Sequence, residues 1–232
     1  MRIACLQHVS FEGPGNIERW ATGRGHGLRT IRLFEGQSPP RPDDFELLVV
    51  MGGPMSVHEA DYPWLIQEKR LIAKCLERNK YILDVCLGSQ LLATSLGGPV
   101  YRNRVREIGW FPIRWREAAA SSFFASEPER LHVLHWHGET YDLPSGCDHL
   151  AESEGCLVQA FEHPSCLGLQ FHLEATPEGL QDMIRHCGSE IGAVPFGQSS
   201  ERMISDERIY RKAAPKNLFG ILDEIEWKLR AS

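Results

Sequence analysis

A cysteine stands where a strand-like run of apolar residues changes into a helix-like pattern. Residues 81–92 read Tyr-Ile-Leu-Asp-Val-Cys-Leu-Gly-Ser-Gln-Leu-Leu, with Cys86 at the junction and Gly88 where a sharp turn leaves no room for a side chain. Such a strand-to-helix turn lifts a nucleophile clear of the sheet, and the first N–H groups of the helix favour a thiolate over a thiol. A lone buried cysteine is usually structural, but this context predicts that Cys86 is a catalytic nucleophile.

Two further segments carry residues that would complete a site around Cys86. Gly52 and Gly53 follow an apolar strand, where paired glycines let a backbone approach a ligand and present N–H groups to an oxyanion. His172 and Glu174 end the last strand and face one side of an extended segment, so the carboxylate can orient the imidazole. Taken singly, a glycine pair is commonly a turn and such a histidine is commonly a hydrogen-bonded residue. Their shared position at strand ends favours a site, because open α/β sheets bind ligands there.

The elements that would position these segments alternate along the first 100 residues. Strand-like runs are expected at 2–7, 28–33, 46–51, 80–86, 109–115, 131–136, 156–162 and 166–172. Helical patterns are expected at 16–26, 63–79 and 87–96. This alternation predicts an α/β fold with a parallel sheet wrapped by helices, and the strand-rich segment from about 99 to 172 predicts added antiparallel edge strands.

The tail has a different pattern. Residues 177–187 read as a helix, 188–200 as a loop and 201–214 as a charged helix, after which Pro215 breaks the pattern. Apolar residues then recur every three or four positions from Leu218 to Leu229, which predicts a final amphipathic helix. We expect one domain over residues 1–190 and a helical extension over 191–232 that packs on it.

Composition excludes several classes of function. The 232 residues carry a net charge of −6 and no basic stripe, which argues against a nucleic-acid partner. No run of about 20 apolar residues and no signal peptide is present, so we expect no membrane contact and a cytoplasmic location. The seven cysteines are odd in number and form no Cys-x-x-Cys pair, which argues against a disulfide framework or a zinc ribbon.

The three ordered motifs, together with two nearby segments, resemble those of a known family. Residues 86–93 resemble the nucleophile motif of the class I glutamine amidotransferases, residues 51–56 their oxyanion segment and residues 170–174 their His-x-Glu motif. Residues 107–110 and 135–144 resemble the stand-alone members that are similar to the glutaminase domain of GMP synthase. The resemblance spans about residues 45–178. It implies a flavodoxin-like fold with a mixed, mostly parallel sheet, helices on both faces and a nucleophile elbow.

The resemblance also implies a reaction. Cys86 would attack the side-chain amide of glutamine, with His172 as the base and Glu174 orienting it. Backbone N–H groups of Gly53 and Leu87 would form the oxyanion hole. The remaining implied substrate-binding residues are Gly52, Pro54, Gln90 and His137. The products would be glutamate and ammonia, and no metal or organic cofactor is expected.

Two clusters of charged or titratable residues allow other readings. His132, His135 and His137 alternate on one expected strand and would share a face, as a metal site needs, but no nearby carboxylate or cysteine is evident. We therefore expect no metal and treat His137 as a residue that lines the pocket. Three arginines at 102, 104 and 106 suit a solvated face, or alternatively a contact with an anion or partner beside the site.

Asp84 departs from the family pattern, which usually has a small residue two positions before the nucleophile. A carboxylate close to the sulfur would raise the pKa of the Cys86 thiol and weaken or redirect the activity. In that case Asp84→Gly would raise thiolate reactivity. In the alternative, Asp84 turns away from the sulfur and hydrogen-bonds a loop.

Three functions are compatible with the sequence. The first is a glutaminase that passes ammonia to a separate synthase, because 232 residues leave no space for an acceptor domain. The second is a γ-glutamyl peptidase or hydrolase that uses the same Cys86, His172 and Glu174. The third is a catalytically weak subunit that docks a partner through its arginines and its final amphipathic helix.

Overall fold

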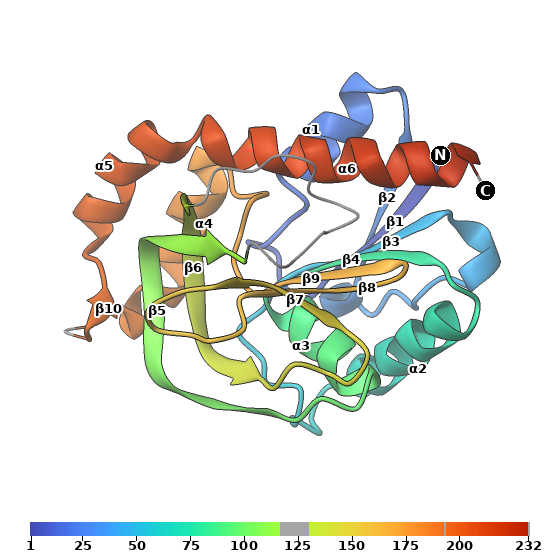
Figure 1. The fold of residues 1–232 in the computed structure, drawn as a ribbon, viewed down its shortest axis with the longest axis horizontal. Helices are drawn as coiled ribbons and strands as arrows, with labels where there is room; N and C mark the ends of the chain where they lie inside the picture. The colour runs from blue at the N-terminus through green and yellow to red at the C-terminus, as the bar shows by residue number, and fades with distance from the viewer. Residues whose placement is uncertain (117–129, 193, 232) are drawn as a thin grey trace.

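Within the described residues, ten strands form one mixed sheet that organises the molecule (Figure 1). The computed structural model describes residues 1–116, 130–192 and 194–231. Five neighbouring strands run parallel in the order β9-β4-β3-β1-β2. These strands are β1 (Arg2–Gln7), β2 (Gly27–Arg32), β3 (Leu47–Val50), β4 (Tyr81–Val85) and β9 (Cys166–Leu169). The predicted parallel sheet is confirmed: β1 has the predicted bounds, and the ends of the other four strands shift by at most three residues.

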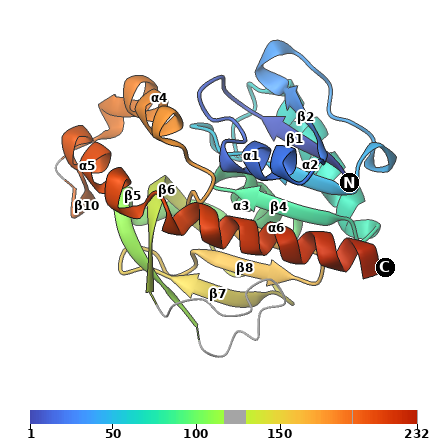
Figure 2. The ribbon, with the colours of Figure 1, turned by 90° about the horizontal axis from the view of Figure 1, so that it is seen from above.

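Helices cover both faces of the parallel strands (Figure 2). One face packs on α1 (Asn16–Gly23) and α6 (Ala213–Ala231), and the other packs on α2 (Pro63–Glu77) and α3 (Leu87–Ser95). Alternate residues of β3 enter the two cores, since Leu47 and Val49 face α1 and α6 whereas Leu48 and Val50 face α2 and α3. This double burial explains why the strand reads as a continuous apolar run.

The segment from residue 99 onward widens the sheet with antiparallel strands. They are β5 (Val100–Trp115), β6 (Arg130–Tyr141), β7 (Asp148–Glu152) and β8 (Ala160–His163). The antiparallel edge is confirmed, but β7 has no counterpart in the sequence prediction, and the strand expected at 156–162 begins only at Ala160. Short 3-10 turns lie at Leu33–Glu35, Pro42–Asp44 and Gly188–Glu190.

The C-terminal residues return to the sheet. Helices α4 (Pro177–Cys187) and α5 (Ser200–Tyr210) lie beside β5 and β6, and β10 (Phe196–Gly197) pairs with β5 (Figure 1). The prediction for Pro215 was wrong, because this proline lies in the first turn of α6, where its missing N–H costs no helical hydrogen bond. Within the described residues, no helix combines the length and apolar character needed to cross a membrane.

Candidate active site

Cys86 occupies a tight turn between β4 and α3. Its φ of 52° is left-handed, a conformation that non-glycine residues rarely adopt outside functional sites, and it precedes the first helical residue, Leu87. The Cys86 N–H donates to the carbonyl of Leu169 at 2.7 Å, which ties the turn to β9. A Cβ placed on Gly88 would lie 2.4 Å from the carbonyl oxygen of Val50, so only glycine fits. The elbow is therefore fixed by the sheet on one side and by close backbone packing on the other.

His172 and Glu174 form a buried pair beside this turn. Nδ1 of His172 lies 2.7 Å from Oε1 of Glu174, and both side chains are almost fully buried. Burial alone would lower the pKa of His172, but the charge of Glu174 and the interaction with Cys86 outweigh it and raise this pKa well above its usual value. Nε2 of His172 has no hydrogen-bond partner in the described part of the chain. One nitrogen is thus held by the carboxylate, and the other is free to exchange a proton with the thiol.

Distant segments hold this pair in place. The N–H of His172 donates to the carbonyl of Leu134 in β6 at 2.8 Å, and the N–H of Asn16 donates to the carbonyl of Glu174 at 2.8 Å. Gly15 has φ 48°, and a Cβ there would lie 2.2 Å from the same Glu174 carbonyl oxygen. The start of α1 therefore fixes the backbone that presents the carboxylate.

The glycine pair lies between Cys86 and β1. A Cβ on Gly52 would come within 3.2 Å of Cε1 of His172 and 3.4 Å of Cβ of Cys86, so this backbone packs directly on the two. A Cβ on Gly53 would lie 3.2 Å from the Leu87 side chain. In the described residues, nothing accepts a hydrogen bond from the Gly53 N–H, and the N–H of Leu87 is unpaired as a first-turn helical donor.

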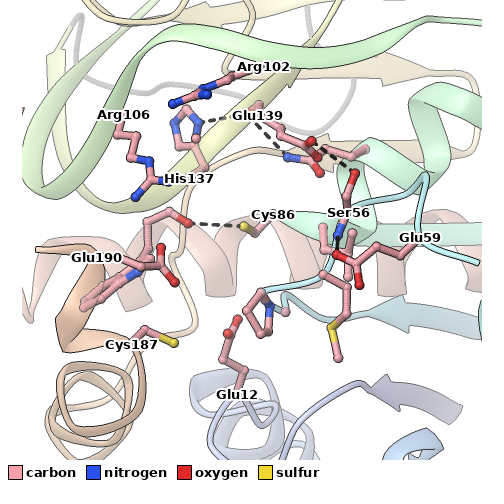
Figure 3. A pocket seen from close by; sticks show the side chains of 17 residues that line it. Glu12, Ser56, Glu59, Cys86, Arg102, Arg106, His137, Glu139, Cys187 and Glu190 are labelled. Carbon is pink, nitrogen blue, oxygen red and sulfur yellow. Dashed lines mark hydrogen bonds between the residues drawn. The ribbon is translucent and has the colours of Figure 1, made fainter. Parts of the chain in front are cut away.

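Cys86 opens into a cavity of about 450 Å³, a size usual for a small-molecule site. Of the residues predicted to bind substrate, Pro54, Gln90 and His137 line it, whereas Gly52 is absent from its lining. Figure 3 shows Arg102 and Arg106 on one side of Cys86 and Glu12 on the other. Glu59, Glu139 and Glu190 add further carboxylates to its wall. The cavity thus offers both signs of charge around one thiol.

Gln90 and His137 are held by hydrogen bonds at one end of the cavity. Nε2 of Gln90 donates to the carbonyl of Glu139 at 3.4 Å and to the side chain of Gln170 at 3.2 Å. Nδ1 of His137 lies 3.1 Å from the carbonyl of Glu139, and its Nε2 lies 3.1 Å from Glu107. Both side chains converge on the same short segment of β6, which makes this end of the cavity rigid.

The histidines of β6 do not share one face. His132 stacks on Tyr210 of α5 with ring centroids 4.4 Å apart, while His135 and His137 are buried on the opposite side of the strand, because strand side chains alternate with period two. The expectation of one shared face was therefore wrong for His132. The missing carboxylate is Glu107 of β5, and its ligand atom lies within 4.8 Å of those of His135 and His137.

Hydrogen bonds already occupy this carboxylate. Oε1 of Glu107 accepts from Ser153 at 2.7 Å, and Oε2 accepts from Gln159 at 2.7 Å. Although burial opposes it, the hydrogen bond from His137 and the other donors lower the pKa of Glu107 to about 2, and burial lowers the pKa of His135 to about 4. We describe the group as a hydrogen-bonded network that orients His137, not as an open metal site.

Glu12 is a cavity residue that sequence reasoning missed. It lies in the loop between β1 and α1, and Oε2 would come within 2.3 Å of a Cβ on Gly52. Desolvation in the cavity raises the pKa of Glu12 to about 7, although the charge of His172 opposes the rise. The signal was the Glu-Gly-Pro-Gly turn at 12–15, in the segment between the first strand and the first helix. Of the arginine cluster, Arg102 and Arg106 line the cavity and Arg104 does not.

Asp84 does not line the cavity around Cys86. It is fully buried on the α2 side of β4, where the charges it meets include Glu68, and burial raises the pKa of Asp84 well above its usual value. Neither carboxylate oxygen has a hydrogen-bond partner within the described ranges. The alternative of a hydrogen bond to a loop was therefore wrong. The influence of Asp84 on the thiol stays a prediction.

Comparisons with known proteins agree with this geometry. Residues 28–190 match the family model for the class I glutamine amidotransferases. The chain is 33% identical to the glutamine amidotransferase-like protein YfeJ of Salmonella typhimurium, over 97% of both chains. A crystal structure of a glutamine amidotransferase from Thermotoga maritima has a TM-score of 0.89 and 29% identity, and the match covers 97% of each chain.

GMP synthases match over a shorter segment. The chain is 38% identical to the GMP synthase of Thermomicrobium roseum over 57% of its own length, but the match covers only 24% of that longer protein. The whole-chain matches and the family model agree on the class of domain. This chain belongs to the class I glutamine amidotransferase family.

Proposed function

We propose that the protein hydrolyses the side-chain amide of glutamine to glutamate and ammonia through a thioester on Cys86. One observation carries the proposal: a left-handed cysteine at the start of α3 meets a buried His–Glu pair whose second imidazole nitrogen has no partner among the described residues. This arrangement matches the nucleophile, base and orienting acid of a catalytic triad. The first-turn N–H groups of α3 add electrostatic stabilisation of the thiolate.

The reaction proceeds in two balanced halves. Sulfur of Cys86 attacks the amide carbon while Nε2 of His172 takes the thiol proton, and Glu174 stabilises the imidazolium that forms. The imidazolium then protonates the departing nitrogen, the C–N bond breaks and ammonia leaves a γ-glutamyl thioester. Water attacks the thioester after losing a proton to His172, which returns the proton to sulfur as glutamate leaves.

Two backbone donors fit the developing oxyanion. The Gly53 N–H is unpaired within the described residues, and the Leu87 N–H points from the first turn of α3. Gly53, Leu87 and Cys86 all line the cavity. Losing one such donor typically lowers kcat by about 10²–10³, so the arrangement of this backbone adds to what the triad contributes.

The charges of the cavity fit an amino acid. Arg102 and Arg106 supply positive charge for the α-carboxylate, and the carboxylate of Glu139 supplies negative charge for the α-ammonium group. Gln90 and His137 fix the segment that carries Glu139. Ser56 also donates to Oε1 of Glu139 at 3.1 Å, which orients that carboxylate.

Ammonia released here needs an acceptor. We propose that a separate synthase consumes it, because the chain matches the GMP synthase of Thermomicrobium roseum over 24% of that protein. The seven cysteines are free thiols, and a catalytic thiol suits a reducing compartment such as the cytoplasm.

Glutamate release from glutamine tests the proposal. Purified protein is assayed at neutral pH, with Cys86→Ala as the matched variant and with Cys187→Ala as a control for a second cysteine that lines the cavity. We expect Cys86→Ala to reduce the rate to background and Cys187→Ala to stay within about threefold of wild type. Equal rates for wild type and Cys86→Ala would overturn the proposal.

A second substrate class is favoured by the acidic side of the cavity. In Figure 3, Glu12 lies across Cys86 from the two arginines, and a cationic leaving group larger than ammonia would be held there. We propose γ-glutamyl amines as alternative substrates for the same thiol. If glutamate appears from γ-glutamyl amines and not from glutamine, the second function replaces the first.

A further inference from the structure

A second buried histidine contacts the glycine pair from behind. His8 follows β1, and its Nδ1 lies 2.9 Å from the carbonyl oxygen of Gly52. Its Nε2 lies 2.8 Å from Oε1 of Glu68, which projects from the buried face of α2. Both side chains are completely buried. Because a carbonyl oxygen only accepts, Nδ1 must carry the proton that is shared with Gly52.

The contact determines which way the neighbouring donor faces. The Gly52 carbonyl and the Gly53 N–H belong to one planar trans peptide, so they point in opposite directions. Holding the carbonyl against His8 therefore directs the Gly53 N–H away from His8 and toward the cavity that Gly53 lines. Glycines at both positions leave this peptide free to rotate, so an external contact is needed to hold it.

The surroundings of His8 fix its position. Trp64 stacks on the imidazole with ring centroids 5.3 Å apart, and a Cβ on Gly53 would lie 3.2 Å from Cβ of His8. Burial would lower the pKa of His8, but the charge and hydrogen bond of Glu68, followed by the Gly52 carbonyl, raise it. The charge of Glu12 also acts on His8 from the cavity side. Asp84 and Lys69 interact with Glu68, the partner of His8.

We propose that His8, oriented by Glu68, is a positioning residue that holds the Gly52–Gly53 peptide with its N–H facing the oxyanion. This inference rests on the proposed function, because the oxyanion forms only during attack by Cys86. His8 touches no reacting atom and acts through the peptide alone.

Two substitutions separate the contacts of His8. In His8→Asn the amide nitrogen is bonded to Cγ, as Nδ1 is, so it can still donate to Gly52 while Glu68 loses its partner. In His8→Gln the amide nitrogen reaches the position of Nε2, so the Glu68 contact remains while the Gly52 contact is lost. A merely structural role predicts more harm from His8→Asn, because that variant leaves a buried charge unpaired.

Kinetics give the first readout. We expect His8→Gln to lower kcat about 100-fold, the lower end of the loss for a missing oxyanion donor, with KM within about threefold. His8→Asn should keep kcat within about fivefold of wild type. Alkylation of Cys86 by iodoacetamide builds no oxyanion, so its rate should stay unchanged in both. Wild-type kcat in His8→Gln, or an equal fall in His8→Asn, would overturn the proposal.

Nuclear magnetic resonance tests the peptide without any turnover. The sequence contains two Gly–Gly pairs, 52–53 and 97–98, so glycine labelled with ¹³C at the carbonyl and with ¹⁵N gives two coupled signals. We expect the Gly52 carbonyl signal to move upfield in His8→Gln and to stay in His8→Asn, while the Gly97 signal serves as an internal control. An unmoved Gly52 signal in His8→Gln refutes the positioning role. Lack of glutamate release by wild type, with a moved signal, refutes the proposed function and leaves the positioning role supported.

Discussion

Two buried His–Glu pairs lie on opposite sides of one glycine pair, and they differ in what the second nitrogen meets. In His172 and Glu174 the contact is 2.7 Å, and in His8 and Glu68 it is 2.8 Å. The remaining nitrogen of His172 has no hydrogen-bond partner in the described ranges, whereas that of His8 is bonded to the Gly52 carbonyl. The same two residue types thus suit proton transfer in the His172–Glu174 pair and backbone positioning in the His8–Glu68 pair.

The pairs also differ in how the chain builds them. Glu174 lies two residues after His172 in one extended segment, so local geometry alone brings the carboxylate to the imidazole. Glu68 lies 60 residues after His8 and reaches it only because α2 packs on the strands beside β1. We therefore expect the first pair to resist changes in helix packing and the second to depend on them.

The largest effect that separates the pairs comes from neutralising their carboxylates. Glu174→Gln removes the anion that stabilises the imidazolium and should lower kcat by about 10⁴, the loss typical of an orienting carboxylate. Glu68→Gln should lower kcat less than about fivefold, because its amide can donate to Nε2 of a neutral His8 that still donates from Nδ1 to Gly52. Steady-state glutamate release measures both.

The alkylation rate of Cys86 serves as the control for that comparison. Iodoacetamide reacts with the thiolate form of Cys86. Glu174→Gln should therefore slow the alkylation near neutral pH, while Glu68→Gln should not. If Glu68→Gln reduced kcat as strongly as Glu174→Gln does, the two pairs would share one role and the distinction would fail.

A smaller effect comes from Glu12, whose charge acts on both His172 and His8. Its pKa of about 7 means that it ionises as the pH rises through neutrality. The anion favours the imidazolium of His172, so wild-type kcat/KM should exceed that of Glu12→Gln about threefold at pH 8 and equal it at pH 6. A pH profile of Glu12→Gln that superimposes on the wild-type profile would exclude this influence.

Rising pH should have the opposite effect on stability at Glu12: ionisation of this residue favours activity but lowers the free energy of unfolding. The folded-state pKa of Glu12 is raised above the unfolded value, so its stabilising contribution is full below about pH 4.3 and is lost as the pH rises through about 7. The melting temperature of Glu12→Gln, relative to that of wild type, should therefore rise between pH 5 and pH 8. Thermal unfolding of both proteins across this range measures the difference, and a difference that falls would contradict the prediction.

The parts of the site that sequence reasoning anticipated are local. The elbow at Cys86, the glycine pair and the His-x-Glu segment each depend on a spacing of a few residues, and the parallel strands carry them to the same edge of the sheet. Alternate residues of β1, β3 and β4 are buried in the two cores, so these strands appear in the sequence as continuous apolar runs. Both the fold class and the adjacency of the three segments followed from these patterns.

The parts that escaped prediction depend on long-range packing. No local spacing connects Glu68 to His8, or Glu107 to His137, because the members of each contact lie on different elements and far apart in the sequence. The strand β7 was missed because only two of its five residues are buried and the other three are exposed or half-buried polar residues. The sequence left two alternatives for Asp84, a side chain close to the sulfur or one turned away from it, because the residue lies both in a strand and next to the turn at Cys86.

The smallest effect on activity is expected from Asp84, which faces Glu68 behind the site. Asp84→Asn should leave kcat and the alkylation rate of Cys86 within about twofold of wild type, because the side chain does not line the cavity that holds the thiol. It should raise stability, since the raised pKa of Asp84 means that wild type loses stability as the pH rises through that pKa while the amide does not titrate. Each kcal/mol gained would raise the melting temperature by about 2–4 °C. A faster alkylation rate in Asp84→Asn would instead place the carboxylate within electrostatic reach of the sulfur. The charges around His8 and Glu68 would then act on the thiol through Asp84.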